Sequence, residues 1–182
     1  MRKLFGLARK RLLFMAAPTG SIDLKNCTLK FVDATTPTAN SLDVHVDEGN
    51  IQWTRKRNIE AKKDRGILSY LKEGDQEPLE VNIECRFDVL KSNSGDAVTP
   101  FEFLEKTGNA SSYTSTSPAC EPYTIDIFVY NDNPCTGTTL DEIHQFSKFA
   151  FTEIGGDYKA GTLSVKGICN SLRPIATRTT LP

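Results

Sequence analysis

The sequence predicts a mainly β protein, a sandwich or barrel of about seven or eight strands with one short flanking α-helix. Three observations favour this class: segments that alternate apolar and polar residues, turn signals between them, and a single helix-capping motif. The clearest alternation is LEVNIECRFDVL at residues 79–90. From Leu79 to Val89 its odd positions are apolar and its even positions are polar, as in a long strand with one buried and one polar face.

The same patterns, with β-branched and aromatic content, predict the remaining strands. Segment 22–32 changes parity near Lys25-Asn26, which indicates a bulge. Turns are expected at Gly49-Asn50, at 64–66 and at 155–157. The other expected strands are residues 42–48, 51–61, 67–71, 123–130, 140–154 and 162–169.

One helix is predicted, from the capping box Thr99-Pro100-Phe101-Glu102. Thr99 is the N-cap, Pro100 the first helical residue and Glu102 the third. Gly108 is the expected stop.

The 182 residues divide into a basic N-terminal arm (1–20), one β domain (21–174) and a polar C-terminal tail (175–182). Residues 1–14 hold five basic and no acidic residues, and because the whole chain is at −1, the rest is net acidic. The segment is interpreted as an arm, as an amphipathic helix that docks on a partner or membrane surface, or as a stretch upstream of a true start at Met15. Its apolar run is too short to cross a bilayer, and no other segment resembles a membrane span.

The five cysteines form no CxxC pair, so neither a zinc knuckle nor a thioredoxin motif is predicted. Cys85 lies on the apolar side of the 79–89 strand and is expected to be buried. Cys120 and Cys135 flank a strand beside prolines and are expected to be exposed. They are candidates for a disulfide, within or between chains, if the protein works outside a cell.

No local signature of catalysis, metal binding or cofactor binding occurs. His45 and His144 are both interpreted as solvated surface groups. Glu80, Glu84 and Asp88 share the polar face of one strand, which fits a wet sheet face better than a glycosidase pair.

Residues 55–78 form a highly charged excursion between two good strands. Its basic part could bind phosphates, with Trp53 and Tyr70 nearby for stacking. Acidic residues follow at once, however, and opposite charges side by side favour docking to a second copy of the chain. The contact candidates are Arg55, Lys56, Arg57, Lys62, Lys63, Asp64, Arg65, Glu73, Asp75 and Glu77.

Three stretches, in order, resemble the tail tube (major tail) proteins of long-tailed bacteriophages. They are residues 49–87, with a DRG turn and the EGDxEPLEV entry into the long strand; CEPYTIDIFVY at 120–130; and 146–170, which closes on GTLSVKGIC. The resemblance spans roughly residues 21–174, and the basic segment before Met15 departs from it.

The resemblance implies a β-sandwich whose six copies form a ring, with inner strands joined into one barrel and rings stacked through long loops and arms. The lumen would conduct DNA, and Glu80, Glu84 and Asp88 are candidates for its lining. The implied partners are further copies, a tape-measure protein, baseplate and tail-terminator proteins, and a sheath if the tail contracts. No cofactor or membrane is implied, and the expected location is the virion tail, assembled in the host cytoplasm.

Three other readings remain open. The first is the inner tube of a contractile injection or secretion particle. The second is a monomeric β-sandwich that binds carbohydrate or protein. The third is an enzyme that uses the acidic face of the 79–89 strand.

Overall fold

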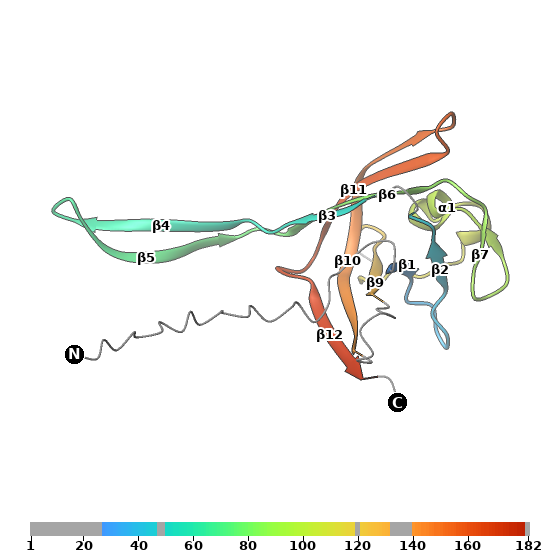
Figure 1. Cartoon of the computed structure of the whole chain (residues 1–182), viewed down its shortest axis with the longest axis horizontal. Coiled ribbons are helices and arrows are strands. Elements are labelled where there is room, and N and C mark those ends of the chain that lie inside the picture. The colour runs from blue at the N-terminus through green and yellow to red at the C-terminus, as the bar shows by residue number, and fades with distance from the viewer. Residues whose placement is uncertain (1–26, 47–49, 119–120, 132–139, 181–182) are drawn as a thin grey trace, which may run out of the picture.

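The computed structural model describes residues 27–46, 50–118, 121–131 and 140–180. The chain is mainly β, as predicted, and is built on an antiparallel sheet of eight strands in the order β2-β1-β9-β10-β11-β6-β3, with β12 also paired to β10 (Figure 1). These strands are β1 (Cys27–Val32), β2 (Ser41–Val44), β3 (Ile51–Thr54), β6 (Leu79–Arg86), β9 (Ile125–Asn131), β10 (Leu140–Asp157), β11 (Thr162–Cys169) and β12 (Ile175–Thr180).

Two small ribbons bring the number of strands in the described residues to twelve, above the expected seven or eight. One is the hairpin of β4 (Arg57–Asp64) and β5 (Ile67–Gln76). The other pairs β7 (Leu90–Lys91) with β8 (Ala97–Val98). Neither ribbon joins the main sheet.

The long strand β10 belongs to both halves of the sheet. Its first part pairs with β9 and β12, and from Phe149 onward it pairs with β11. Between these parts the register shifts and Lys148 takes a left-handed φ of 53°, as in a bulge that bends a strand. The Asp126 carboxylate accepts a hydrogen bond from the Lys148 amide at 2.8 Å and thereby holds the bend.

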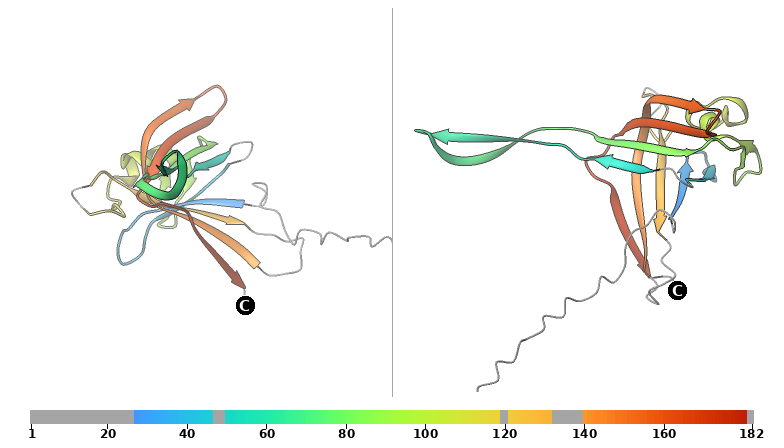
Figure 2. Two further views of the ribbon diagram at one scale, coloured as in Figure 1. Left: turned by 90° about the vertical axis from the view of Figure 1, so that its left-hand side faces the viewer. Right: turned by 45° about the horizontal axis from the view of Figure 1, so that its top comes forward.

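The two parts of β10 define two half-sheets. The first half-sheet comprises β2, β1, β9, the beginning of β10 and β12. The second half-sheet comprises β10 from Phe149, β11, β6 and β3. The two views of Figure 2 show that the strands of the two halves run in different directions.

The core lies where the apolar faces of the half-sheets meet. In β6 the odd residues are buried and the even residues more exposed, which confirms the predicted alternation from Leu79 to Arg86. The prediction is wrong beyond that point, because β6 ends at Arg86 and Val89 is 70% exposed. Strands β9 and β11 follow the same rule. Each fully buried large side chain contributes about 2 kcal/mol through removal of apolar surface from water. The largest of them are Tyr113, Phe31, Phe103, Phe146 and Phe149.

Helix α1 (Pro100–Glu105) covers one part of the core, and its predicted capping box is confirmed. The Thr99 hydroxyl accepts from the Glu102 amide at 3.1 Å, and the Glu102 carboxylate accepts from the Thr99 amide at 2.8 Å. The helix stops before the predicted glycine, because Lys106 already adopts the left-handed conformation. Gly108 instead begins a single 3-10 turn, Gly108–Ala110.

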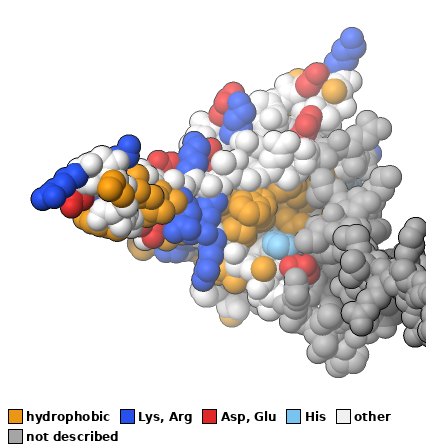
Figure 3. All heavy atoms as spheres, turned by 60° about the vertical axis from the view of Figure 1, so that its left-hand side comes forward, with side chains coloured by type: hydrophobic (Ala, Val, Ile, Leu, Met, Phe, Trp, Pro, Cys, Tyr) orange, Lys and Arg blue, Asp and Glu red, His pale blue; other side chains and the backbone are white. Residues whose placement is uncertain are grey.

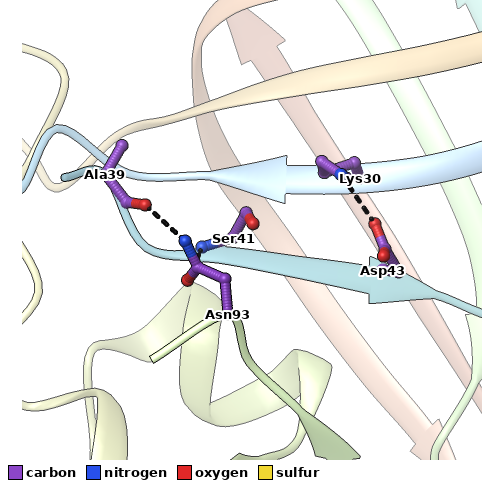
Figure 4. Close-up of polar contacts among 5 residues, drawn as sticks. All are labelled: Lys30, Ala39, Ser41, Asp43 and Asn93. Carbon is purple, nitrogen blue, oxygen red and sulfur yellow. Dashed lines mark hydrogen bonds and ion pairs between the residues drawn. The ribbon is translucent and has the colours of Figure 1, made fainter. Parts of the chain in front are cut away.

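Polar side chains hold the loops around β1 and β2. Asn93 lies beside the start of β2, accepting from the Ser41 amide and donating to the Ala39 carbonyl, both at 2.8 Å, while Lys30 and Asp43 link the two strands at 3.2 Å (Figure 4). The buried Asp33 carboxylate accepts from the Thr114 amide at 3.1 Å and so joins this region to a distant loop.

Two expectations about the chain's last third are wrong. Gly155 and Gly156 lie inside β10 and pair with β11, and the turn comes later, where Asp157 accepts from the Lys159 amide at 2.8 Å. The expected C-terminal tail instead contains β12, which pairs with β10 from Leu140 to Gln145. The bulge expected near Lys25-Asn26 lies outside the described residues, as does the N-terminal arm.

Candidate interaction surfaces

The excursion at 55–78 is a hairpin that stands away from the body. β5 continues to Gln76, past Leu71 where the predicted strand ends, so that β4 and β5 make one long ribbon (Figures 1 and 2). Arg65 and Gly66 close it with φ values of 49° and 84°, and a two-residue turn with both φ values positive suits the twist of a hairpin. Every residue of β4 is exposed, and so is nearly all of β5.

Apolar side chains are exposed on both faces of the hairpin, and more of them share one face, which also carries Lys63 and Glu73. Ala61 pairs with Leu71 and Lys63 pairs with Leu68 across a register shift, and paired or alternate residues share a face. Ile59 lies on this face as well, whereas Ile67 and Tyr70 lie on the other, opposite Asp64 and Lys62. We name Ile59, Ala61, Leu68 and Leu71 the hairpin apolar face. Leu71 is 62% exposed, so nothing described in this chain covers it.

Charges at the two ends of the hairpin behave differently. At the base, Lys56 binds Glu80 at 2.6 Å and Arg57 binds Glu73 at 3.2 Å, so part of the charge expected to meet a second copy is paired internally. The hydrogen bond from Lys56 to Glu80 raises the pKa of that lysine. Figure 3 shows basic side chains at the tip and at the base, with hydrophobic side chains between them.

The remaining contact candidates are exposed along the hairpin. Lys63, Asp64 and Arg65 form the tip, and Lys62 pairs with its own neighbour Glu60 at 2.8 Å. Arg55, Asp75 and Glu77 lie near the base, beside Arg57 and Glu73. These residues thus lie along one projecting element, some at its tip and some at its base, and their contact with a second copy stays a prediction.

The proposed lumen residues are only partly on one face. Glu80 and Glu84 lie on the outer face of β6, where Lys166 of β11 stands opposite Asn82. Asp88 does not join them, because β6 ends at Arg86. Its carboxylate instead lies 3.2 Å from Arg86 Nε and 3.5 Å from His45 Nδ1.

The second half-sheet has open edges on both sides. β3 pairs only with β6, and β10 beyond Phe149 pairs only with β11, within the part of the chain that is described. An unpaired strand edge is a ready site for pairing with another chain. The order of the strands along the chain does not reveal these open edges, because the sequence carries no signal for which strands become neighbours in the sheet.

The histidines and cysteines are in contrasting environments. His45 is exposed as predicted, but His144 is largely buried, with its Nε2 atom 3.5 Å from Glu142. It faces inward because β10 places it opposite the buried Val129. Cys85 and Cys169 are buried free thiols, whereas Cys120 and Cys135 lie outside the described residues, and their predicted disulfide with them.

The sequence matches no protein-family model and no curated protein. Among the described residues, no helix has the length and apolarity needed to cross a membrane. The same residues contain no group of three or more His, Cys, Asp or Glu side chains arranged to hold a metal ion.

Proposed function

We propose that this chain is a structural protein that assembles with copies of itself into a hollow tube, the tail tube of a long-tailed phage, through which DNA leaves the particle. The observation that carries the proposal is the β4–β5 hairpin with its uncovered apolar face. An isolated two-stranded ribbon is at best marginally stable in water, and exposed apolar patches mark association sites. A partner that covers the hairpin would remove both costs.

The second half-sheet supports ring formation. Its neighbouring strands are all antiparallel, so β10 and β3, the outer strands, run in opposite directions. If β3 of one copy pairs with β10 of the next, the new contact is also antiparallel. Such a head-to-tail contact uses two different surfaces and closes into a ring when the rotation allows. The hexameric ring is taken from the resemblance to tail tube proteins.

The outer face of the same half-sheet suits a DNA conduit. It carries Glu80, Glu84 and Glu153, and Lys56 and Lys166 pair with two of these carboxylates. A face whose cations are already paired offers little attraction to phosphates, so DNA would pass without binding. Tape-measure, baseplate and terminator proteins, and a sheath in a contractile tail, would then be the other partners.

Electron microscopy of the purified full-length protein in negative stain, with light scattering, tests the proposal. Hollow rings or tubes are expected. Leu71→Ser on the hairpin apolar face should reduce tube yield at least tenfold, whereas Tyr70→Ser, on the opposite face with similar exposure, should preserve tubes. A uniform monomer at high concentration, unaltered by either substitution, would instead favour the monomeric binding module.

A further inference from the structure

We infer that a second exposed apolar cluster, at the opposite end of the body, receives the hairpin apolar face of another copy. This cluster, named the knob here, consists of Phe87, Val89 and Tyr158. The inference rests on the proposed function, since it requires that the chain self-associates, and it adds where the hairpin binds.

The knob is built by two segments that are distant in the sequence. The Phe87 amide donates to the Gly161 carbonyl at 2.9 Å, which fixes the β10–β11 turn against the end of β6. The Phe87 and Tyr158 rings then meet edge to face, with centroids 5.6 Å apart. Phe87 packs partly against the core, while Tyr158 is 85% exposed and Val89, two residues beyond Phe87, is 70% exposed.

The knob and the hairpin lie at opposite ends of the same strand. Thr162, after the knob turn, pairs with Arg86 at one end of β6, and the hairpin joins β6 at its other end, Leu79. Seven residue steps of about 3.3 Å separate these ends. Figure 1 shows the hairpin projecting to the left of the body and the β10–β11 turn projecting to its upper right.

Charge is complementary between the two ends. The outer part of the hairpin, residues 59–72, carries four basic and two acidic residues. The knob end, residues 84–107 with 157–161, carries six acidic and four basic residues. A hairpin that approaches the knob end of another copy therefore meets opposite net charge, whereas two hairpins that approach each other meet like charge.

Two different surfaces at opposite ends are what an open, repeating contact requires. A hairpin that binds the knob of the next copy leaves its own knob free for a third, so the contact propagates along one axis. The side chains of Leu68 and Leu71 would lie against Tyr158 and Val89. The hairpin apolar face and the knob would then cover each other's exposed area.

Disulfide capture between two single-cysteine variants tests the pairing. Both are made in full-length protein in which Cys27, Cys120 and Cys135 are replaced by Ser, and the buried Cys85 and Cys169 are kept. One variant carries Leu68→Cys on the hairpin and the other carries Tyr158→Cys on the knob. Thr177→Cys, an exposed position on β12, is the matched control for the knob. Light scattering and microscopy record assembly in every sample.

On mild oxidation, a mixture of the Leu68→Cys and Tyr158→Cys proteins should give a covalent dimer, at least tenfold more than either variant alone or than Leu68→Cys with Thr177→Cys. Dimer formed by Leu68→Cys alone would show hairpin-to-hairpin contact and overturn the inference. Rings or tubes without the mixed dimer would overturn it too and leave the proposed function standing. Protein that neither assembles nor crosslinks would overturn both.

Discussion

At the scale of single residues, Gly167 shows how tightly the second half-sheet is packed. A Cβ at this position would lie 2.3 Å from the Ala150 carbonyl oxygen and 2.5 Å from the Phe149 ring, and neither the backbone nor a buried ring can move away cheaply. Glycine is therefore required here by close approach, although this strand has ordinary extended geometry.

We expect Gly167→Ala to lower the free energy of unfolding by about 3 kcal/mol, because it overpacks the contact between β10 and β11. Gly155→Ala is the matched control, since a Cβ there meets nothing within 4 Å. Urea unfolding monitored by circular dichroism would measure both. Equal unfolding midpoints for the two variants would contradict the predicted contact.

The two buried thiols predict a loss of stability at alkaline pH. Burial raises the pKa of both Cys85 and Cys169 to about 12, and the nearby carboxylates of Asp88 and Glu84 add to the effect at Cys85. An unfolded cysteine titrates near 8.5, so the folded state holds its proton while the unfolded state releases it. The stabilisation is therefore complete below about pH 8.5 and is lost progressively as pH rises toward 12.

Each thiol should contribute a loss of about 1.4 kcal/mol per pH unit in that window. Because lysines and tyrosines titrate there too, the comparison is with Cys85→Ala/Cys169→Ala, whose stability should fall less steeply between pH 8.5 and 10.5. Urea midpoints at several pH values give the two slopes. Identical slopes for the two proteins would mean that these thiols ionise as readily in the folded state as in the unfolded state.

At the scale of elements, the β4–β5 hairpin differs from the strands of the body in what holds it together. β6 has paired neighbours on both sides and a buried face, whereas β4 and β5 have only each other. Local openings cost little free energy where few buried contacts resist them.

We therefore expect the amides of residues 57–76 to exchange with deuterium at least a hundredfold faster than those of 79–86 in unassembled protein. In the proposed tube a partner covers the ribbon, so assembly should slow the hairpin amides by a similar factor. Hydrogen exchange with mass spectrometry measures both, and β6 provides the internal reference. A hairpin as protected as β6 before assembly would contradict this account.

At the scale of the whole molecule, the sequence predicts those features of the fold that depend on residues close together in the chain. The alternation within β6, from Leu79 to Arg86, and the capping box at Thr99 are confirmed, since each depends on residues close in the chain. β12 was missed because its strand character comes from pairing with β10. Gly155 and Gly156 resemble a turn in sequence, because their own composition carries no sign of the partner strand that keeps them extended.

The same distinction between local and long-range information applies to the candidate surfaces. The charged hairpin was found from composition and from the turn residues at 64–66. Its apolar face was missed because register shifts within the ribbon hide the period-two pattern of Leu68 and Leu71. The knob was missed for another reason: Phe87 and Tyr158 meet only through the register of β6 with β11.

The shared strand β10 has a mechanical consequence. A force along β10 would act in shear on its hydrogen bonds to β9, β11 and β12, so that many bonds would have to break together. A force that separates β4 from β5 at the base of the hairpin would break the hydrogen bonds between them one after another. We expect single-molecule pulling to open the ribbon at a much lower force than the body. A tube built from such units would yield at its joints before its wall tears.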